Sequence, residues 1–135
     1  MKVFLDSNFL VYMNTMTDDK RKGIDRLFRE LLEESLLINV LVIDETLYVS
    51  RRYGVPYNVT LDFLREIVLP YIEVIPIGEE DIKPVEKYLL KYDFKPSDAI
   101  HLATMVKTGA NHIVTEDEDF DRVEEVRRIW LDLSE

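Results

Sequence analysis

Short apolar runs alternate along this chain with longer segments of helical periodicity, and this alternation limits the fold more than any other feature of the sequence. We expect strands at residues 2–5, 36–40, 73–77, 112–115 and 126–131. The first is a short apolar run of the kind found in parallel sheets, where helices cover both faces of each strand. Pro76 cannot donate a backbone hydrogen bond, so the strand 73–77 is expected at a sheet edge or to end there.

The segments between these strands have helical signals. Residues 9–13 begin a helix, and further helices are expected at 20–34, 42–53, 59–69, 79–92 and 96–108. Gly54 and Gly109 follow two of them at the position where a left-handed cap is common. Strands that alternate with helices predict an α/β fold with a mainly parallel sheet and helices on both faces.

The bulk composition indicates a small folded domain. The chain has 135 residues, of which 47% are hydrophobic and 33% charged, so we expect residues 1–135 to form a single domain with one core. No apolar stretch approaches the ~20 residues of a membrane span, and the amino terminus lacks the apolar core of a signal peptide. We therefore expect a cytoplasmic protein. The absence of cysteine excludes disulfides and thiolate metal sites.

Asp6 stands at the end of the first predicted strand, between the apolar segments 2–5 and 9–13. Open α/β sheets bind ligands at the carboxyl ends of their strands, so Asp6 falls where such a fold places chemistry. The structural alternative is that Asp6 only caps the helix that follows, by accepting hydrogen bonds from its free N–H groups.

Glu45 lies on the predicted helix 42–53, and its same-face neighbours include Val42 and Val49. A carboxylate that faces a core is costly unless a partner offsets its charge. The alternative is a partly exposed ion pair with Arg51 or Arg52.

Asp98 opens the predicted helix 96–108 and shares its face with Leu102 and Met105. An acid in the first turn of a helix interacts favourably with the helix dipole. That structural explanation does not account for the apolar neighbours of this acid.

A dense acidic run follows the predicted strand 112–115 and consists of Glu116, Asp117, Glu118 and Asp119. Like charges at this density repel one another, and they are tolerated when water or a cation lies among them. The net charge of −10 leaves both possibilities open. If the four acidic positions converge on one sheet edge, oxygen ligands without cysteine favour Mg²⁺ or Mn²⁺ over zinc or copper.

Three motifs resemble those of a known family. FLDSNFLVY, LVIDETLYVSRRYG and KPSDAIHLATMVKTGANHIVTEDEDFD occur in this order over nearly the whole chain. They resemble the PIN-domain family, and within it the small stand-alone members of the VapC toxin type. The last motif is the most specific, since it combines a helix-opening acid, a strand and Thr-x-Asp-x-Asp-Phe.

The resemblance implies a three-layer α/β/α sandwich with a mainly parallel central sheet. It also implies an endoribonuclease that depends on Mg²⁺ or Mn²⁺, hydrolyses RNA phosphodiester bonds, forms a homodimer and is blocked by a cognate antitoxin protein. Carried over by motif, the catalytic and metal-binding acids are Asp6, Glu45, Asp98 and Asp117, and Asp119 is an alternative or outer metal ligand.

Two further positions match small polar residues that support such a site by hydrogen bonds, namely Asn8 and Thr115. Glu116 and Glu118 make the last loop more acidic than the motif requires, which leaves open which of its acids touch metal. His101 is a candidate general base by residue type, although a histidine in a helix more often has a structural hydrogen bond.

Residues that contact RNA are not assigned by these motifs. Two basic groups are candidates for phosphate contacts: Arg51 with Arg52, and the set Lys20, Arg21, Lys22, Arg26 and Arg29. A solvated helix face is the alternative for both. Aromatic side chains can stack on bases, and the candidates are Tyr48, Tyr53 and Tyr57. The alternative is that these tyrosines make core or dimer contacts.

Other protein classes share parts of this pattern. Haloacid-dehalogenase-like enzymes also place an aspartate after the first strand, but they need a second one two residues later, where this chain has Asn8. Receiver domains need paired acids before a phospho-accepting aspartate, and no good match occurs. The remaining alternative is a non-catalytic PIN-like module that binds protein or RNA.

Overall fold

The computed structural model describes residues 1–131, and its strands form one parallel sheet. The strands are β1 (Lys2–Leu5), β2 (Ser35–Asn39), β3 (Ile72–Ile75), β4 (His112–Val114) and β5 (Arg127–Ile129). They lie in the order β3-β2-β1-β4-β5, and all four neighbouring pairs are parallel. β1 is therefore the central strand, and the carboxyl ends of all strands point to one edge.

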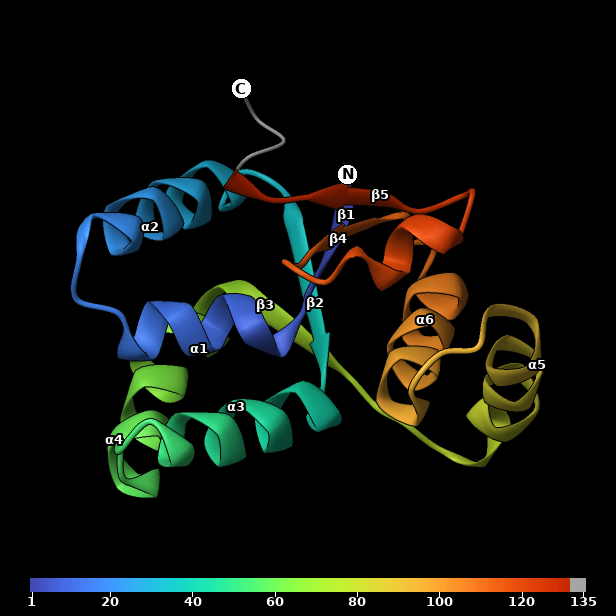
Figure 1. Ribbon diagram of the computed structural model, residues 1–135, viewed down its shortest axis with the longest axis horizontal. Helices are drawn as coiled ribbons and strands as arrows, with labels where there is room; N and C mark the ends of the chain where they lie inside the picture. The colour runs from blue at the N-terminus through green and yellow to red at the C-terminus, as the bar shows by residue number, and fades with distance from the viewer. Residues whose placement is uncertain (132–135) are drawn as a thin grey trace.

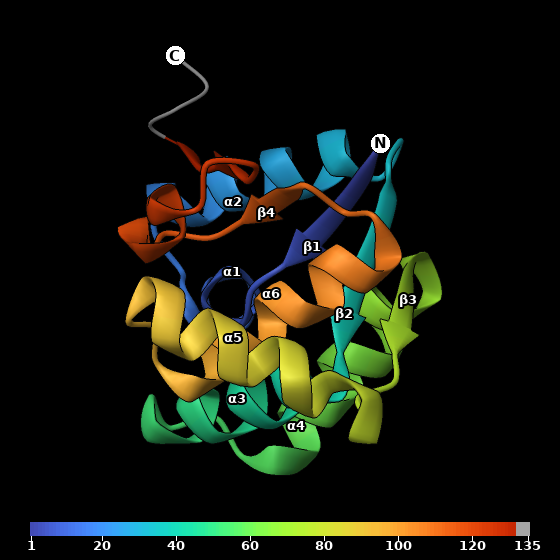
Figure 2. The same ribbon diagram turned by 90° about the vertical axis from the view of Figure 1, so that its right-hand side faces the viewer.

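Helices cover both faces of this sheet (Figure 1). The α-helices are α1 (Ser7–Thr15), α2 (Asp19–Leu31), α3 (Val40–Arg52), α4 (Tyr57–Phe63), α5 (Ile82–Tyr92) and α6 (Pro96–Thr108). α1 to α4 gather on one side of the sheet, and α5 and α6 lie on the other, which is the side that faces the viewer in Figure 2. The predicted α/β/α sandwich with a mainly parallel central sheet is thus confirmed.

The core explains why these segments take up their positions. Val3, Phe4 and Leu5 on β1 have no exposed surface, as expected for a central strand covered on both faces. On α2 the residues that recur at helical spacing are buried, from Ile24 to Leu31. Burial of these apolar side chains is the main force that holds the helices to the sheet.

The segment 59–69, expected as one helix, is more complex in the structure. α4 ends at Phe63 and continues as a π-helical turn over Leu64–Val68 and a 3₁₀ turn over Leu69–Tyr71. Pro70 within the last turn lacks the N–H that a continuing α-helix would need. Leu64 and Val68, at the two ends of the wide turn, are both buried.

The remaining boundaries follow the sequence closely. β3 is an edge strand that ends one residue before Pro76, as the proline predicts. The segment 79–92 begins as a 3₁₀ turn, Glu79–Asp81, before α5. Another 3₁₀ turn, Glu118–Arg122, separates β4 from β5. Within residues 1–131, no helix is long and apolar enough to cross a lipid bilayer.

Candidate active site

Asp6 lies at the carboxyl end of the central strand and is 5% exposed. Its Oδ1 accepts a hydrogen bond from the Ser7 N–H at 2.8 Å, which caps α1. Its Oδ2 accepts one from the Thr115 hydroxyl, also at 2.8 Å. The capping interpretation of Asp6 is therefore correct, but it uses only one of the two oxygens. Burial raises the pKa of Asp6 above its usual value.

Asn8 and Thr115 link the start of the chain to the loop after β4. The Asn8 amide donates to the Thr115 Oγ1 at 2.9 Å, and its carbonyl oxygen accepts from the Glu116 N–H at 3.2 Å. The same Thr115 oxygen accepts from the Asp117 N–H at 3.0 Å. These bonds hold the acidic loop beside the carboxylate of Asp6.

Glu45 projects from the second turn of α3 toward the same edge. The buried face of α3 consists of Val42, Thr46 and Ser50, so Glu45 lies at the boundary of that face and its side chain is 25% exposed. Its Oε1 is 2.8 Å from His101 Nε2. The predicted alternative partners, Arg51 and Arg52, lie in the last turn of the same helix, and the polar partner of Glu45 is instead this histidine.

Asp98 occupies the first turn of α6 and is also 5% exposed. Its Oδ2 is the one buried side-chain oxygen or nitrogen in the described part of the chain that has no hydrogen-bond partner. Burial, reinforced by the charges of Asp6 and Asp117, raises the pKa of Asp98 to about 6. A buried carboxylate oxygen with no partner is costly unless a cation binds it.

Asp117 and Asp119 come from the loop and the 3₁₀ turn that follow β4. Asp117 Oδ1 accepts from the Asp119 N–H at 2.9 Å and so caps this turn. Asp98, Asp117 and Asp119 each offer a carboxylate oxygen, and these oxygens lie within 4.8 Å of one another. Lys95 Nζ stands 3.9 Å from Asp117 Oδ2 and is largely exposed.

The predicted acids thus lie in two adjoining groups. One group joins Asp6, Glu45 and His101, whose ligand atoms lie within 4.8 Å of one another, and the other is the Asp98 group. The charges of Asp6 and Asp117 both raise the pKa of Asp98, so the two groups are near enough to interact. An oxygen-rich site with an unpartnered buried carboxylate oxygen fits a hard divalent cation of the Mg²⁺ or Mn²⁺ type.

Two residues of the site have roles that the sequence did not indicate. His101 is a candidate general base by residue type, but both its ring nitrogens are engaged, Nε2 with Glu45 and Nδ1 with Asn39 at 3.2 Å. Asn39 was not singled out at all. The available signals were its place between β2 and α3, where asparagine caps helices, and the spacing of three residues from Asp98 to His101.

The basic candidates for RNA contacts lie on α2 and at the end of α3. Lys20 pairs with Glu116 at 3.3 Å, and its ammonium lies over the ring of Tyr12. Arg51 and Arg52 are exposed at the end of α3. The three tyrosines are exposed, which excludes the core alternative for Tyr48, Tyr53 and Tyr57.

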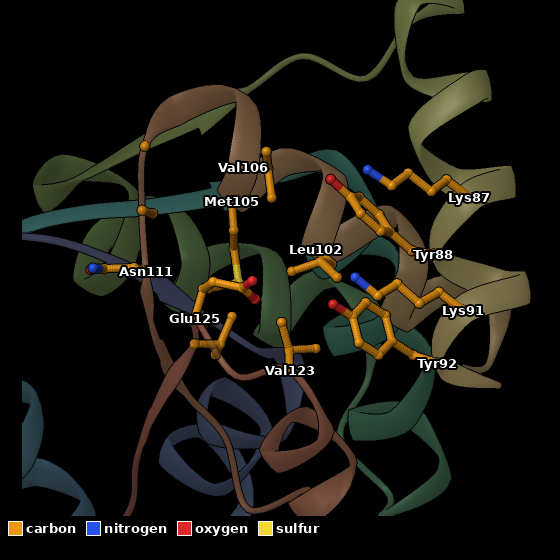
Figure 3. A pocket seen from close by; sticks show the side chains of 13 residues that line it. Lys87, Tyr88, Lys91, Tyr92, Leu102, Met105, Val106, Asn111, Val123 and Glu125 are labelled. Atoms are coloured by element: carbon orange, nitrogen blue, oxygen red, sulfur yellow. The ribbon is translucent and has the colours of Figure 1, made fainter.

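A surface pocket of about 390 Å³ lies beside α5 and α6 (Figure 3). Tyr88 and Tyr92 of α5 and Leu102 and Met105 of α6 line it, with Lys91 at its side. None of the predicted site acids lines this pocket, so the carboxylate site is a separate feature of the surface.

Fold and site together define a class: an α/β/α domain with a carboxylate cluster, suited to a divalent cation, at the carboxyl edge of a parallel sheet. The sequence model of the PIN domain matches residues 3–126. The chain belongs to the PIN-domain family.

This chain is similar to several VapC proteins. Ribonuclease VapC2 of Methanocaldococcus jannaschii is 27% identical over 136 aligned positions, which cover 91% of this chain and 89% of that protein. Among solved structures, a similar one is VapC20 of Mycobacterium tuberculosis, described as a sarcin-ricin loop cleaving toxin. Its TM-score is 0.73 at 17% sequence identity, and the match covers 88% of this chain and 92% of that one. VapBC2 from Rickettsia felis, bound to a promoter DNA fragment, gives 0.70 at 16% identity, with 96% and 98% covered. The predicted resemblance to VapC proteins is confirmed.

Proposed function

We propose that this chain is a metal-dependent endoribonuclease that hydrolyses RNA phosphodiester bonds. The observation that carries the proposal is the unpartnered, buried Oδ2 of Asp98 among the carboxylates of a PIN-domain site. The ribonuclease activity named for the similar VapC2 protein of M. jannaschii supports it.

Asp6, Glu45, Asp98 and Asp117 are proposed to hold the cation, with Asp119 as an alternative or outer ligand. A bound Mg²⁺ or Mn²⁺ would supply a Lewis acid that lowers the pKa of water and offsets the charge of the phosphate. The chain's own residues fix the carboxylates that bind it. Thr115 and Ser7 orient both oxygens of Asp6, and Asn8 holds Thr115 in position.

Lys95 has a separate proposed role, because it is a largely exposed cation beside Asp117. Its ammonium can attract the RNA backbone toward a protein whose net charge is −10. Arg51 and Arg52, at the far end of the helix that carries Glu45, are proposed to extend this attraction along α3.

The partners are also proposals. The similar structures include a toxin–antitoxin complex from Klebsiella pneumoniae, with a TM-score of 0.73 at 15% identity, covering 96% of this chain and 97% of that one. We propose that this chain is the toxin of such a pair, that a cognate antitoxin covers its site, that it forms a homodimer and that it acts on RNA in the cytoplasm.

The test is cleavage of a mixed RNA pool with Mg²⁺, with Mn²⁺ or with a chelator. We expect cleavage with either metal and none with the chelator, and a loss of at least a hundredfold in Asp6→Asn or Asp98→Asn. Asp44→Asn is the matched control, since Asp44 neighbours Glu45 on α3 but is exposed. No cleavage under any metal or pH, together with tight binding of a protein partner, would instead identify a non-catalytic module.

A further inference from the structure

His101 lies beneath Glu45 and is completely buried. Its ring packs against Phe4 of the central strand, with ring centroids 5.1 Å apart. Nε2 faces Glu45 Oε1 at 2.8 Å, and Asp6 Oδ1 lies 3.8 Å from the same nitrogen. A histidine in this position has little freedom to rotate, so the direction of its N–H bond is determined by its neighbours.

Asn39 determines which ring nitrogen carries hydrogen. The Val42 N–H can only donate, and the Asn39 atom that accepts from it at 3.1 Å is Oδ1. The amide nitrogen of Asn39 must then face the other way. It donates one hydrogen to the Thr104 Oγ1 at 2.9 Å and directs the other at His101 Nδ1, 3.2 Å away.

These bonds assign the tautomer of His101. Because an amide N–H points at Nδ1, Nδ1 must be the acceptor and the ring hydrogen must lie on Nε2. Nε2–H then donates to Glu45. A proton on Nδ1 would face the N–H of Asn39, so the amide favours the neutral ring.

We propose that Asn39 and His101 are positioning residues that orient the Glu45 carboxylate for metal binding, an inference that rests on the proposed nuclease site. Asn39 caps α3, the helix that carries Glu45, and through His101 it also fixes the end of the Glu45 side chain. A free glutamate side chain would lose rotamer entropy when it binds a cation. Groups that hold a metal ligand by its remaining hydrogen bonds typically change metal affinity ten- to a hundredfold when removed.

Two substitutions of His101 separate its two hydrogen bonds. The amide nitrogen of glutamine in His101→Gln reaches the place of Nε2 and retains a donor for Glu45. The shorter His101→Asn retains a polar partner for Asn39 but cannot reach Glu45. Mn²⁺ affinity is measured without RNA, by calorimetry or electron paramagnetic resonance. We expect this affinity to fall ten- to a hundredfold in His101→Asn and to stay within about threefold of the wild-type value in His101→Gln.

A double-substitution cycle tests whether the effect passes through Glu45. In a Glu45→Gln background, His101→Asn should change Mn²⁺ affinity by less than about threefold, because coupled residues do not contribute additively. Thermal unfolding of each variant accompanies the titration, so that a poorly folded protein is recognised. Equal Mn²⁺ affinities for His101→Asn and wild type, or fully additive losses in the double variant, would overturn the inference.

Nitrogen NMR of the histidine ring provides a readout that requires neither metal nor RNA. The wild type should show hydrogen on Nε2 and a bare Nδ1. Asn39→Asp keeps the cap on α3 but replaces the amide donor with an acceptor, so it should move hydrogen onto Nδ1 and weaken Mn²⁺ binding. A wild-type ring with hydrogen on Nδ1 would contradict the assignment.

The outcomes also separate this inference from the proposed function. If no RNA is cleaved but His101→Asn still weakens Mn²⁺ binding, the positioning role stands and the nuclease proposal fails. If RNA is cleaved and His101→Asn binds Mn²⁺ as the wild type does, the nuclease proposal stands and the positioning role fails. A wild type that binds no Mn²⁺ would overturn both.

Discussion

At the scale of single residues, Asp98 combines two opposed properties. Its buried, unpartnered oxygen makes the metal-free protein less stable, and the same oxygen is suited to bind a cation. Sites that are costly in the free protein and satisfied by a ligand are common where function and stability compete. The two properties can be measured separately.

The raised pKa of Asp98 predicts how stability depends on pH. Below the ordinary value of 3.8, the carboxyl is protonated in both the native and the unfolded chain. Between 3.8 and about 6 only the native chain keeps the proton, so the free energy of unfolding falls as pH rises through this window. At pH 7 the cost is complete, at up to about 3 kcal/mol.

Asp98→Asn should therefore stabilise the metal-free protein at pH 7 and have little effect at pH 4. Thermal unfolding in a chelating buffer measures both values. Adding Mn²⁺ should raise the melting temperature of the wild type, since a ligand bound only to the native state stabilises it, and should not raise that of Asp98→Asn. Asp44→Asn should shift equally at the two pH values, and a lower melting temperature for Asp98→Asn at pH 7 would contradict the prediction.

A second prediction at the scale of residues concerns the Thr115 hydroxyl. Thr115→Val removes the hydroxyl that donates to Asp6 and accepts from Asn8 and the Asp117 N–H. Buried polar groups left without partners cost about 1–3 kcal/mol each, so urea unfolding should show a loss of at least that size, and RNA cleavage should fall as well.

The matched control is Thr108→Val at the carboxyl end of α6, where the hydroxyl bonds only to carbonyls of its own helix. Such a bond adds little to stability, and the expected loss is below about 1 kcal/mol. Equal losses in the two valine variants would contradict a linking role for Thr115.

At the scale of elements, replacing two helix glycines by alanine should change the melting temperature in opposite directions. Gly109 ends α6 with a φ of +79°, a conformation that costs an alanine about 1–2 kcal/mol. Gly23 lies within α2, and a Cβ there would meet the Leu131 side chain at an ordinary 3.6 Å. Gly109→Ala should lower the melting temperature, whereas Gly23→Ala should raise it through about 0.5–1 kcal/mol of helix propensity. Calorimetry measures both, and a stabilising Gly109→Ala would contradict the backbone assignment.

Elements with local signals could be predicted from the sequence. The bounds of β1 and α6 agree with the expected 2–5 and 96–108, because an apolar run and a Pro…Gly frame mark them locally. The π turn after α4 could not be predicted, since it depends on how Leu64 and Val68 meet the core. The acids were found by motif and strand-end position. The bond from Asn39 to His101 spans 62 residues and follows only from the fold.

At the scale of the whole molecule, the net charge affects how the proposed RNA substrate can approach. With a net charge of −10, the chain must offer local cations to a polyanion, and Arg51 and Arg52 are exposed in the last turn of the helix that carries Glu45. Each phosphate contact contributes about one unit to the slope of log affinity against log salt.

Replacing Arg51 and Arg52 together by alanine should therefore weaken RNA binding and reduce this slope by about two. Binding is measured by fluorescence anisotropy at several salt concentrations, with Asp6→Asn protein to prevent cleavage. Lys83→Ala, on α5 across the sheet, is the control and should leave the slope unchanged. An unchanged slope in the double variant would show that RNA approaches over another surface.

The hydrogen bond from Thr115 to Asp6 joins residues 109 positions apart. During synthesis Asp6 is made early. Its hydroxyl partner, Thr115, is added only after most of the described chain has been translated. Chains that are still short of β4 have only part of the acidic centre. Under the proposed function, an unfinished chain is therefore inactive, and activity begins only when β4 has been translated and has docked beside β1.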